Sequence, residues 1–194
     1  MKKMLLVTLL AVSSSSFAAN SLNLPAQEYN YLNCLDGSLF KKPATWNEAQ
    51  DAFLDHSDIF KSKQLKALFT LKNDTPDEGD APPSLLLKPK KSITLLGLPI
   101  SQISVYSDSA MSGSTGVSLI TPKSVKETQA IMEKKYGKFA NFDSLVSGQG
   151  FGISKLYKFD SSDGQQELIQ HSITLKKPEK GKGTVVDCSI LGGV

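Results

Sequence analysis

Residues 163–175, with the sequence DGQQELIQHSITL, decide the fold class. The pair Asp163-Gly164 is a strong signal for a tight turn between two antiparallel strands. After this turn, the side chains from Leu168 to Leu175 alternate between an apolar set and a polar set, which is the period of a half-buried strand. We therefore expect a long hairpin, in which the first strand follows the glycines of 148–152 and ends near Phe159.

Further strands are expected before and after this hairpin. The segments 92–96 and 100–107 are rich in β-forming residues and are separated by Gly97-Leu98-Pro99, which predicts a second hairpin. Short strands are also expected at 117–120 and at 184–190.

Three helices are expected. Thr45 and Glu48 have the spacing of a capping box at the start of the first helix, and the second is expected over 62–72. The third has Thr121 as N-cap and Pro122 in its first turn. Its apolar stripe and its terminating glycine are Val125, Thr128, Met132, Tyr136 and Gly137.

The expected elements follow the order α-α-β-β-β-α-β-β-β. This order predicts an α+β fold with one or two antiparallel sheets and helices packed on one face. Residues 19–44 are expected to be irregular, and the acidic, proline-containing segment 73–91 is interpreted as a linker. We expect one domain over 19–194, with 45–121 and 122–190 as possible sub-units.

The N-terminus has the three regions of a secretory signal peptide. Lys2 and Lys3 precede an apolar run that is too short to span a bilayer, and a polar segment with small residues follows. We expect 1–18 to be removed by cleavage between Ala18 and Ala19. The mature protein would then be periplasmic or secreted, with no transmembrane segment.

Two cysteines remain in this oxidising compartment, which favours a disulfide between Cys34 and Cys188. The bond would close a loop of more than 150 residues and join the N-terminal segment to the last strand.

The charge of the chain does not identify a partner. Without Lys2 and Lys3, 20 of the 22 basic residues remain against 19 acidic residues, a formal charge of +1. Every basic residue is a lysine, and the missing arginines would be the side chains best suited to bidentate recognition of phosphate or guanine. Nucleic-acid binding is therefore disfavoured.

The two histidines are the first place to look for acid-base or metal chemistry. His56 lies among Asp51, Asp55 and Asp58, but a solvated acidic helix end explains this cluster better than a metal site. His171 lies on the apolar side of its strand, where a hydrogen-bonded core histidine is the preferred interpretation over a catalytic one. We expect no metal site and no cofactor.

Known catalytic motifs are matched only superficially. Ser38 and Lys41 have the SxxK spacing of penicillin-binding proteins, but the partner motifs SDN and KTG are absent. GxSxG, HExxH and CxxC do not occur. The glycines at 148, 150 and 152 are followed by a strand pattern instead of a helix, so they favour a mobile loop or a bulge over a phosphate site.

These observations favour a non-enzymatic protein of the bacterial envelope that binds another protein, in the manner of small inhibitors or immunity proteins. Met111 and Phe151, each an apolar side chain in a loop of small residues, are the candidate protein-binding residues. The alternatives are a carrier or sensor of a small apolar ligand and, third, a hydrolase that uses His171. Three lysine groups, at 88–91, 134–138 and 176–182, suit an anionic partner only if they converge on one surface.

Overall fold

The structure is a computed structural model, and it describes residues 22–34, 40, 62–74, 84–108, 114–145, 148–160 and 166–192. Its helices are α1 (Ala26–Leu32), α3 (Lys63–Leu68) and α4 (Val125–Tyr136). The strands of the first half are β1 (Phe69–Asp74), β2 (Ser84–Pro89), β3 (Ile93–Leu95), β4 (Leu98–Ile100), β5 (Gln102–Asp108) and β6 (Ser114–Thr121). Those of the second half are β7 (Ala140–Ser144), β8 (Gly148–Asp160), β9 (Gln166–Lys176) and β10 (Thr184–Gly192).

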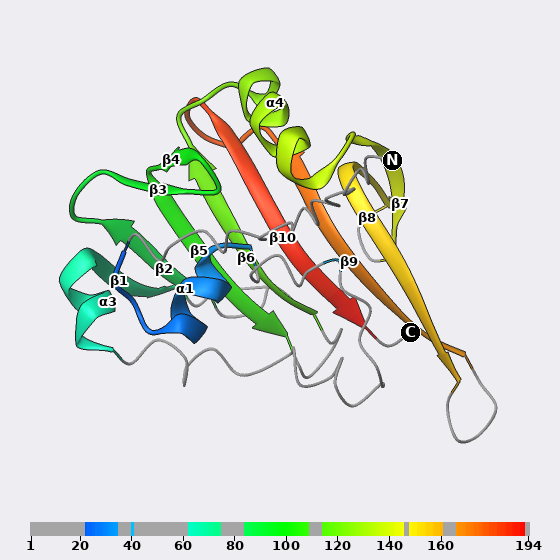
Figure 1. The fold of residues 1–194 in the computed structure, drawn as a ribbon, viewed down its shortest axis with the longest axis horizontal. Coiled ribbons are helices and arrows are strands. Elements are labelled where there is room, and N and C mark those ends of the chain that lie inside the picture. The colour runs from blue at the N-terminus through cyan, green and yellow to red at the C-terminus, as the bar shows by residue number, and fades with distance from the viewer. Residues whose placement is uncertain are drawn as a thin grey trace, which may run out of the picture.

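One 8-stranded antiparallel sheet dominates the molecule (Figure 1), and β3 and β4 form a separate hairpin. The strand order in the large sheet is β1-β2-β5-β6-β10-β9-β8-β7. After β6 the chain passes through α4 to the far edge of the sheet, and β7 to β10 then return strand by strand until β10 pairs with β6. The segments 45–121 and 122–190 therefore contribute to the same sheet.

The alternation of side chains gives the large sheet two different faces. Val117 and Leu119 of β6 lie beside Cys188 and Val186 of β10, and this apolar face continues across β9 through Ile173. The opposite face, which we call the polar face, carries the intervening side chains, most of them Ser, Thr or Gly at the centre. The period of two in β9 and β10 is thus the direct cause of the two faces.

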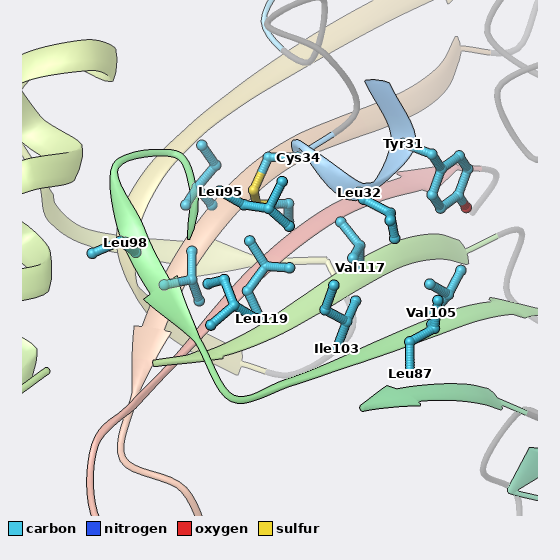
Figure 2. Packing of buried hydrophobic residues seen from close by; sticks show 14 of the residues in the cluster. Tyr31, Leu32, Cys34, Leu87, Leu95, Leu98, Ile103, Val105, Val117 and Leu119 are labelled. Atoms are coloured by element: carbon cyan, nitrogen blue, oxygen red, sulfur yellow. A yellow bond between two sulfur atoms is a disulfide. The ribbon is translucent and has the colours of Figure 1, made fainter. Parts of the chain in front are cut away.

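The N-terminal segment packs on the apolar face and is fastened there by the expected disulfide. Cys34 and Cys188 are bonded across a sequence separation of 154, with their Cα atoms 5.4 Å apart. Figure 2 shows this bond among Leu32, Val117 and Leu119, all of which are fully buried. The hydroxyls of Tyr31 and Thr115 form a further hydrogen bond between α1 and β6.

The β3–β4 hairpin connects α1 to α4 above the same face. The Leu96 amide donates to the Asn33 side chain, which follows α1, and Gly97 lies against Ile131 of α4. Leu96 and Gly97 both have positive φ, as a two-residue hairpin turn requires. The expected hairpin is therefore shifted: the turn is Leu96-Gly97, and Pro99 lies inside β4.

Helix α4 has the expected stripe but a different start. Thr128 and Met132 are fully buried, and Gly137 ends the helix with φ of 97°. The N-cap is Ser124, which forms a capping box with Glu127, instead of Thr121. Thr121 pairs with Thr184 as the last residue of β6, and this sheet contact excludes it from the helix.

Three other sequence expectations are wrong. Residues 26–32, expected to be irregular, form α1, and the helix expected over 62–72 ends at Leu68, where β1 begins. The expected linker contains β2, which pairs with both β1 and β5. The helix expected at Thr45 and the turn Asp163-Gly164 lie outside the described residues, although β8 and β9 pair as a hairpin up to Asp160 opposite Gln166.

Within the described part of the chain, no helix is long and apolar enough to cross a membrane.

Candidate binding face

The candidate functional site is the centre of the polar face, where three side chains from three neighbouring strands meet. Asp187 of β10 lies opposite Ser118 of β6, and Tyr106 of β5 reaches across Gly116 to the same carboxylate. The Tyr106 hydroxyl lies 3.2 Å from each carboxylate oxygen, and the Ser118 hydroxyl donates to Oδ1. A side chain at position 116 would collide with the tyrosine, so glycine is required there.

Burial controls the protonation of this cluster. Removal from water raises the pKa of the Asp187 carboxyl above its usual value of 3.8, against the lowering effects of Ser118, Lys176 and Tyr106. Burial, and then the negative charge of Asp187, raises the pKa of Tyr106 well above 10. The phenol therefore stays protonated at neutral pH and serves as a hydrogen-bond donor.

Hydroxyl groups extend the polar face on both sides of Asp187. Ser189 and Ser172 are hydrogen-bonded to each other at 2.9 Å on neighbouring strands, and Ser154 of β8 continues their row. Thr174 lies directly opposite Asp187 and is partly exposed. Leu156 of β8 lies at the margin of this face and is 47% exposed. Within the described ranges it is the one large apolar side chain that is exposed.

The cluster does not have the composition of a serine hydrolase. Ser118 contacts the carboxylate itself, with no imidazole between them. His171 lies in the row of Ile169 and Ile173 on the apolar face, so the sheet separates its ring from Asp187. The arrangement holds a largely buried carboxyl group among fixed donors, with the partly exposed Ser118 and Thr174 beside it.

His171 is a buried core residue, as the sequence predicts. It is 3% exposed, and its ring packs edge-on against Tyr157 with 4.9 Å between the ring centroids. The Tyr157 hydroxyl in turn donates to the Phe40 carbonyl at 2.7 Å. These contacts join β8 and β9 to Phe40.

Of the two candidate protein-binding residues, the structure describes Phe151. Phe151 lies within β8, partly buried, with its ring packed edge-on against Phe139. Met111 lies outside the described residues. The structure thus assigns Phe151 packing contacts and gives no information about Met111.

The other candidate site residues from the sequence are the glycines of 148–152, His56, Ser38 and Lys41. The glycines of 148–152 are part of β8, and a side chain at Gly152 would collide with the Ile173 carbonyl oxygen, so close strand contact explains this glycine. His56, Ser38 and Lys41 lie outside the described residues. Where the structure describes the chain, no group of three or more His, Cys, Asp or Glu side chains is arranged to hold a metal ion.

Sequence reasoning missed Tyr106 and Asp187. A signal for the aspartate exists in the stretch Val185-Val186-Asp187-Cys188, because it is a single charge in an apolar strand next to the disulfide cysteine. No comparable signal marks Tyr106, whose role depends on the glycine of the neighbouring strand.

No protein-family model, curated protein or solved structure matches this chain significantly.

Proposed function

We propose that this chain is an exported, non-enzymatic binding protein of the bacterial envelope, and that it recognises another protein through the polar face of its sheet. In this proposal the segment 1–18 is a signal peptide, and the mature protein acts in the periplasm or outside the cell. Its manner of action is that of small inhibitors or immunity proteins, which bind a partner without chemical conversion.

The composition of the polar face is the observation that supports the proposal. Hydroxyl side chains and glycine dominate its centre, and Tyr, Ser and Gly also dominate antibody binding surfaces because they offer hydrogen bonds at a low cost in side-chain entropy. Ser118 and Thr174 are the partly exposed hydroxyl residues beside Asp187, whereas Ser172 and Ser189 are buried. Ser118 and Thr174 flank the carboxyl group of Asp187. This single acidic group would fix the position of a partner on the face. The exposed Leu156 lies on the same face and supplies an apolar anchor.

The arrangement of the other elements is consistent with this use. The contacts of α1, the β3–β4 hairpin and α4 all lie on the apolar face, and we infer that the helices form one layer there. Figure 1 shows β8 and β9 extending past the end of β10. A partner would meet the sheet and these two projecting strands.

Site-specific photo-cross-linking tests the proposal in the native envelope. A photoreactive amino acid at Thr174 lies on the polar face, and the same group at Thr94 lies on the exposed side of the β3–β4 hairpin. We expect a protein adduct of higher mass from position 174 and none from position 94. Equal adducts from both positions, or none from position 174, would refute recognition through this face.

A further inference from the structure

The connections of the sheet place separate lysine groups at one end of the molecule. Lys90 and Lys91 follow β2, and Lys123 follows β6. Lys176 ends β9, and the connection from β9 to β10 contributes three more lysines. Because neighbouring strands are antiparallel, the end of β2, the end of β6 and the end of β9 lie at the same end of the sheet. We call this end the basic end.

Hydrogen bonds hold these connections next to one another. The Thr184 hydroxyl donates to the Lys123 carbonyl at 2.8 Å, which joins the β9–β10 connection to the start of α4. The Ser101 amide donates to the Ile120 carbonyl at 2.8 Å, which joins the start of β5 to the end of β6. With strands about 4.8 Å apart, the row from β2 to β9 extends over about 19 Å.

Most lysines of the basic end are exposed. Lys90, Lys177 and Lys180 are exposed, and the acidic residues beside them are Glu127, which caps α4, and Glu179. Among the described residues, Lys123 forms an ion pair with Glu127 at 4.0 Å.

The other end of the sheet has the opposite character. Asp160 and Glu167 lie at the outer end of the β8–β9 hairpin, where Lys158 is the neighbouring cation. Among the described residues, lysines of several connections thus gather at the basic end, whereas Asp160 and Glu167 lie at the opposite end.

We propose that the basic end associates with the anionic phospholipid surface of a membrane. The lysines come from several connections along the row of strand ends and most are exposed, which suits a field of phosphates better than one small anion. Lysine is a compact, strongly hydrated charge, which suits diffuse attraction, and the bidentate recognition typical of arginine is absent because the chain has none. The association is electrostatic and reversible, and it would present the polar face beside the membrane.

Vesicle co-sedimentation tests this proposal with the purified oxidised protein. The probes are vesicles that contain phosphatidylglycerol, vesicles of phosphatidylcholine alone, and soluble polyphosphate. We expect binding to the anionic vesicles only, with loss of binding at high salt. The variant Lys177→Gln/Lys180→Gln should bind roughly 25-fold more weakly, at about fivefold per lysine.

The matched control is Lys72→Gln/Lys158→Gln, which removes the same charge from exposed positions away from the basic end. This control should bind anionic vesicles within about twofold of the wild type, as charges outside the contact are screened within about 10 Å. Equal weakening in both variants, binding to polyphosphate but not to vesicles, or no vesicle binding at low salt would each overturn the proposal. Loss of the protein partner without loss of vesicle binding would leave this inference intact and refute the proposed function alone.

Discussion

The hydroxyl of Tyr106 lies 3.2 Å from both carboxylate oxygens of Asp187, across a neighbouring strand that has glycine at the crossing point. This contact places an aspartate at the centre of a sheet face and keeps it fixed by donors from two other strands. The cost of its burial appears in the raised pKa of the carboxyl. We interpret the Asp187 carboxyl as the group that fixes the position of a partner on the polar face.

The Asp187→Asn variant should change how stability depends on pH. Because the pKa of Asp187 is raised in the folded protein, the folded state holds this proton more tightly than the unfolded state does. The free energy of unfolding of the wild type, relative to that of the variant, should therefore increase as pH falls through the folded pKa toward 3.8. Urea denaturation of both proteins across this range measures the difference.

Glu127 and Glu133 have lowered pKa values and contribute pH dependence of the opposite sign. Both are present in each protein, so their effects cancel in the comparison. A difference that is flat with pH would show that Asp187 is not desolvated in the folded protein.

The Gly152→Ala variant should be strongly destabilised, by about 3 kcal/mol or more, because its side chain would collide with the Ile173 carbonyl. Gly148→Ala is the matched control in the same strand. At Gly148 φ is 76° and a side chain meets no atom within 4 Å, so only backbone strain of about 1 kcal/mol is expected. Similar losses in both variants, measured by urea denaturation, would contradict the close contact between β8 and β9.

Removal of the disulfide should lower the free energy of unfolding substantially. The Cys34→Ser/Cys188→Ser variant loses a cross-link over a separation of 154 residues, for which loop-closure entropy sets a ceiling of about 5 kcal/mol. The readout is the urea midpoint of the oxidised wild type against that of the variant, with the wild type under reducing conditions as a control. If reduction leaves the midpoint unchanged, the cross-link does not stabilise the fold.

The contributions of the buried Glu28 and of Ser62 to the free energy of unfolding should be coupled. The Glu28 carboxylate accepts from the Ser62 amide at 3.1 Å and from its hydroxyl, and the same serine caps α3 by accepting from the Leu65 amide at 2.9 Å. Glu28→Ala should cost about 2 kcal/mol, the range for hydrogen bonds to a charged group.

A double-mutant cycle with Ser62→Ala isolates this interaction. The two losses should be less than additive, with a coupling energy of about 1 kcal/mol or more. Full additivity would show that the two residues act independently.

The fold could be predicted from the sequence wherever one strand carries both an apolar and a polar face. The alternation in β9, the strand expected over 184–190 and the stripe of α4 are local patterns, and the structure confirms each of them, with the last strand extending to Gly192. The disulfide was also predictable, because the chain has only two cysteines.

The expectations failed where tertiary contacts decide the structure. The prolines 82 and 83 precede β2 and Pro89 ends it, so these residues flank a strand instead of preventing one. Helix α1 is short, and its stability comes from burying Tyr29, Tyr31 and Leu32 against the sheet. The polar face could not be predicted because its cluster joins three strands whose register is set by long-range pairing.

Native mass spectrometry of the protein purified from its own envelope is the most direct test of protein recognition through the polar face. The wild type should carry the added mass of a second protein under gentle conditions and release it on denaturation. The variant Thr174→Lys, which places a long charged side chain beside Asp187 on the polar face, should carry none. A wild-type chain that carries only a small molecule or nothing, or a variant that keeps its partner, would contradict protein recognition through this face.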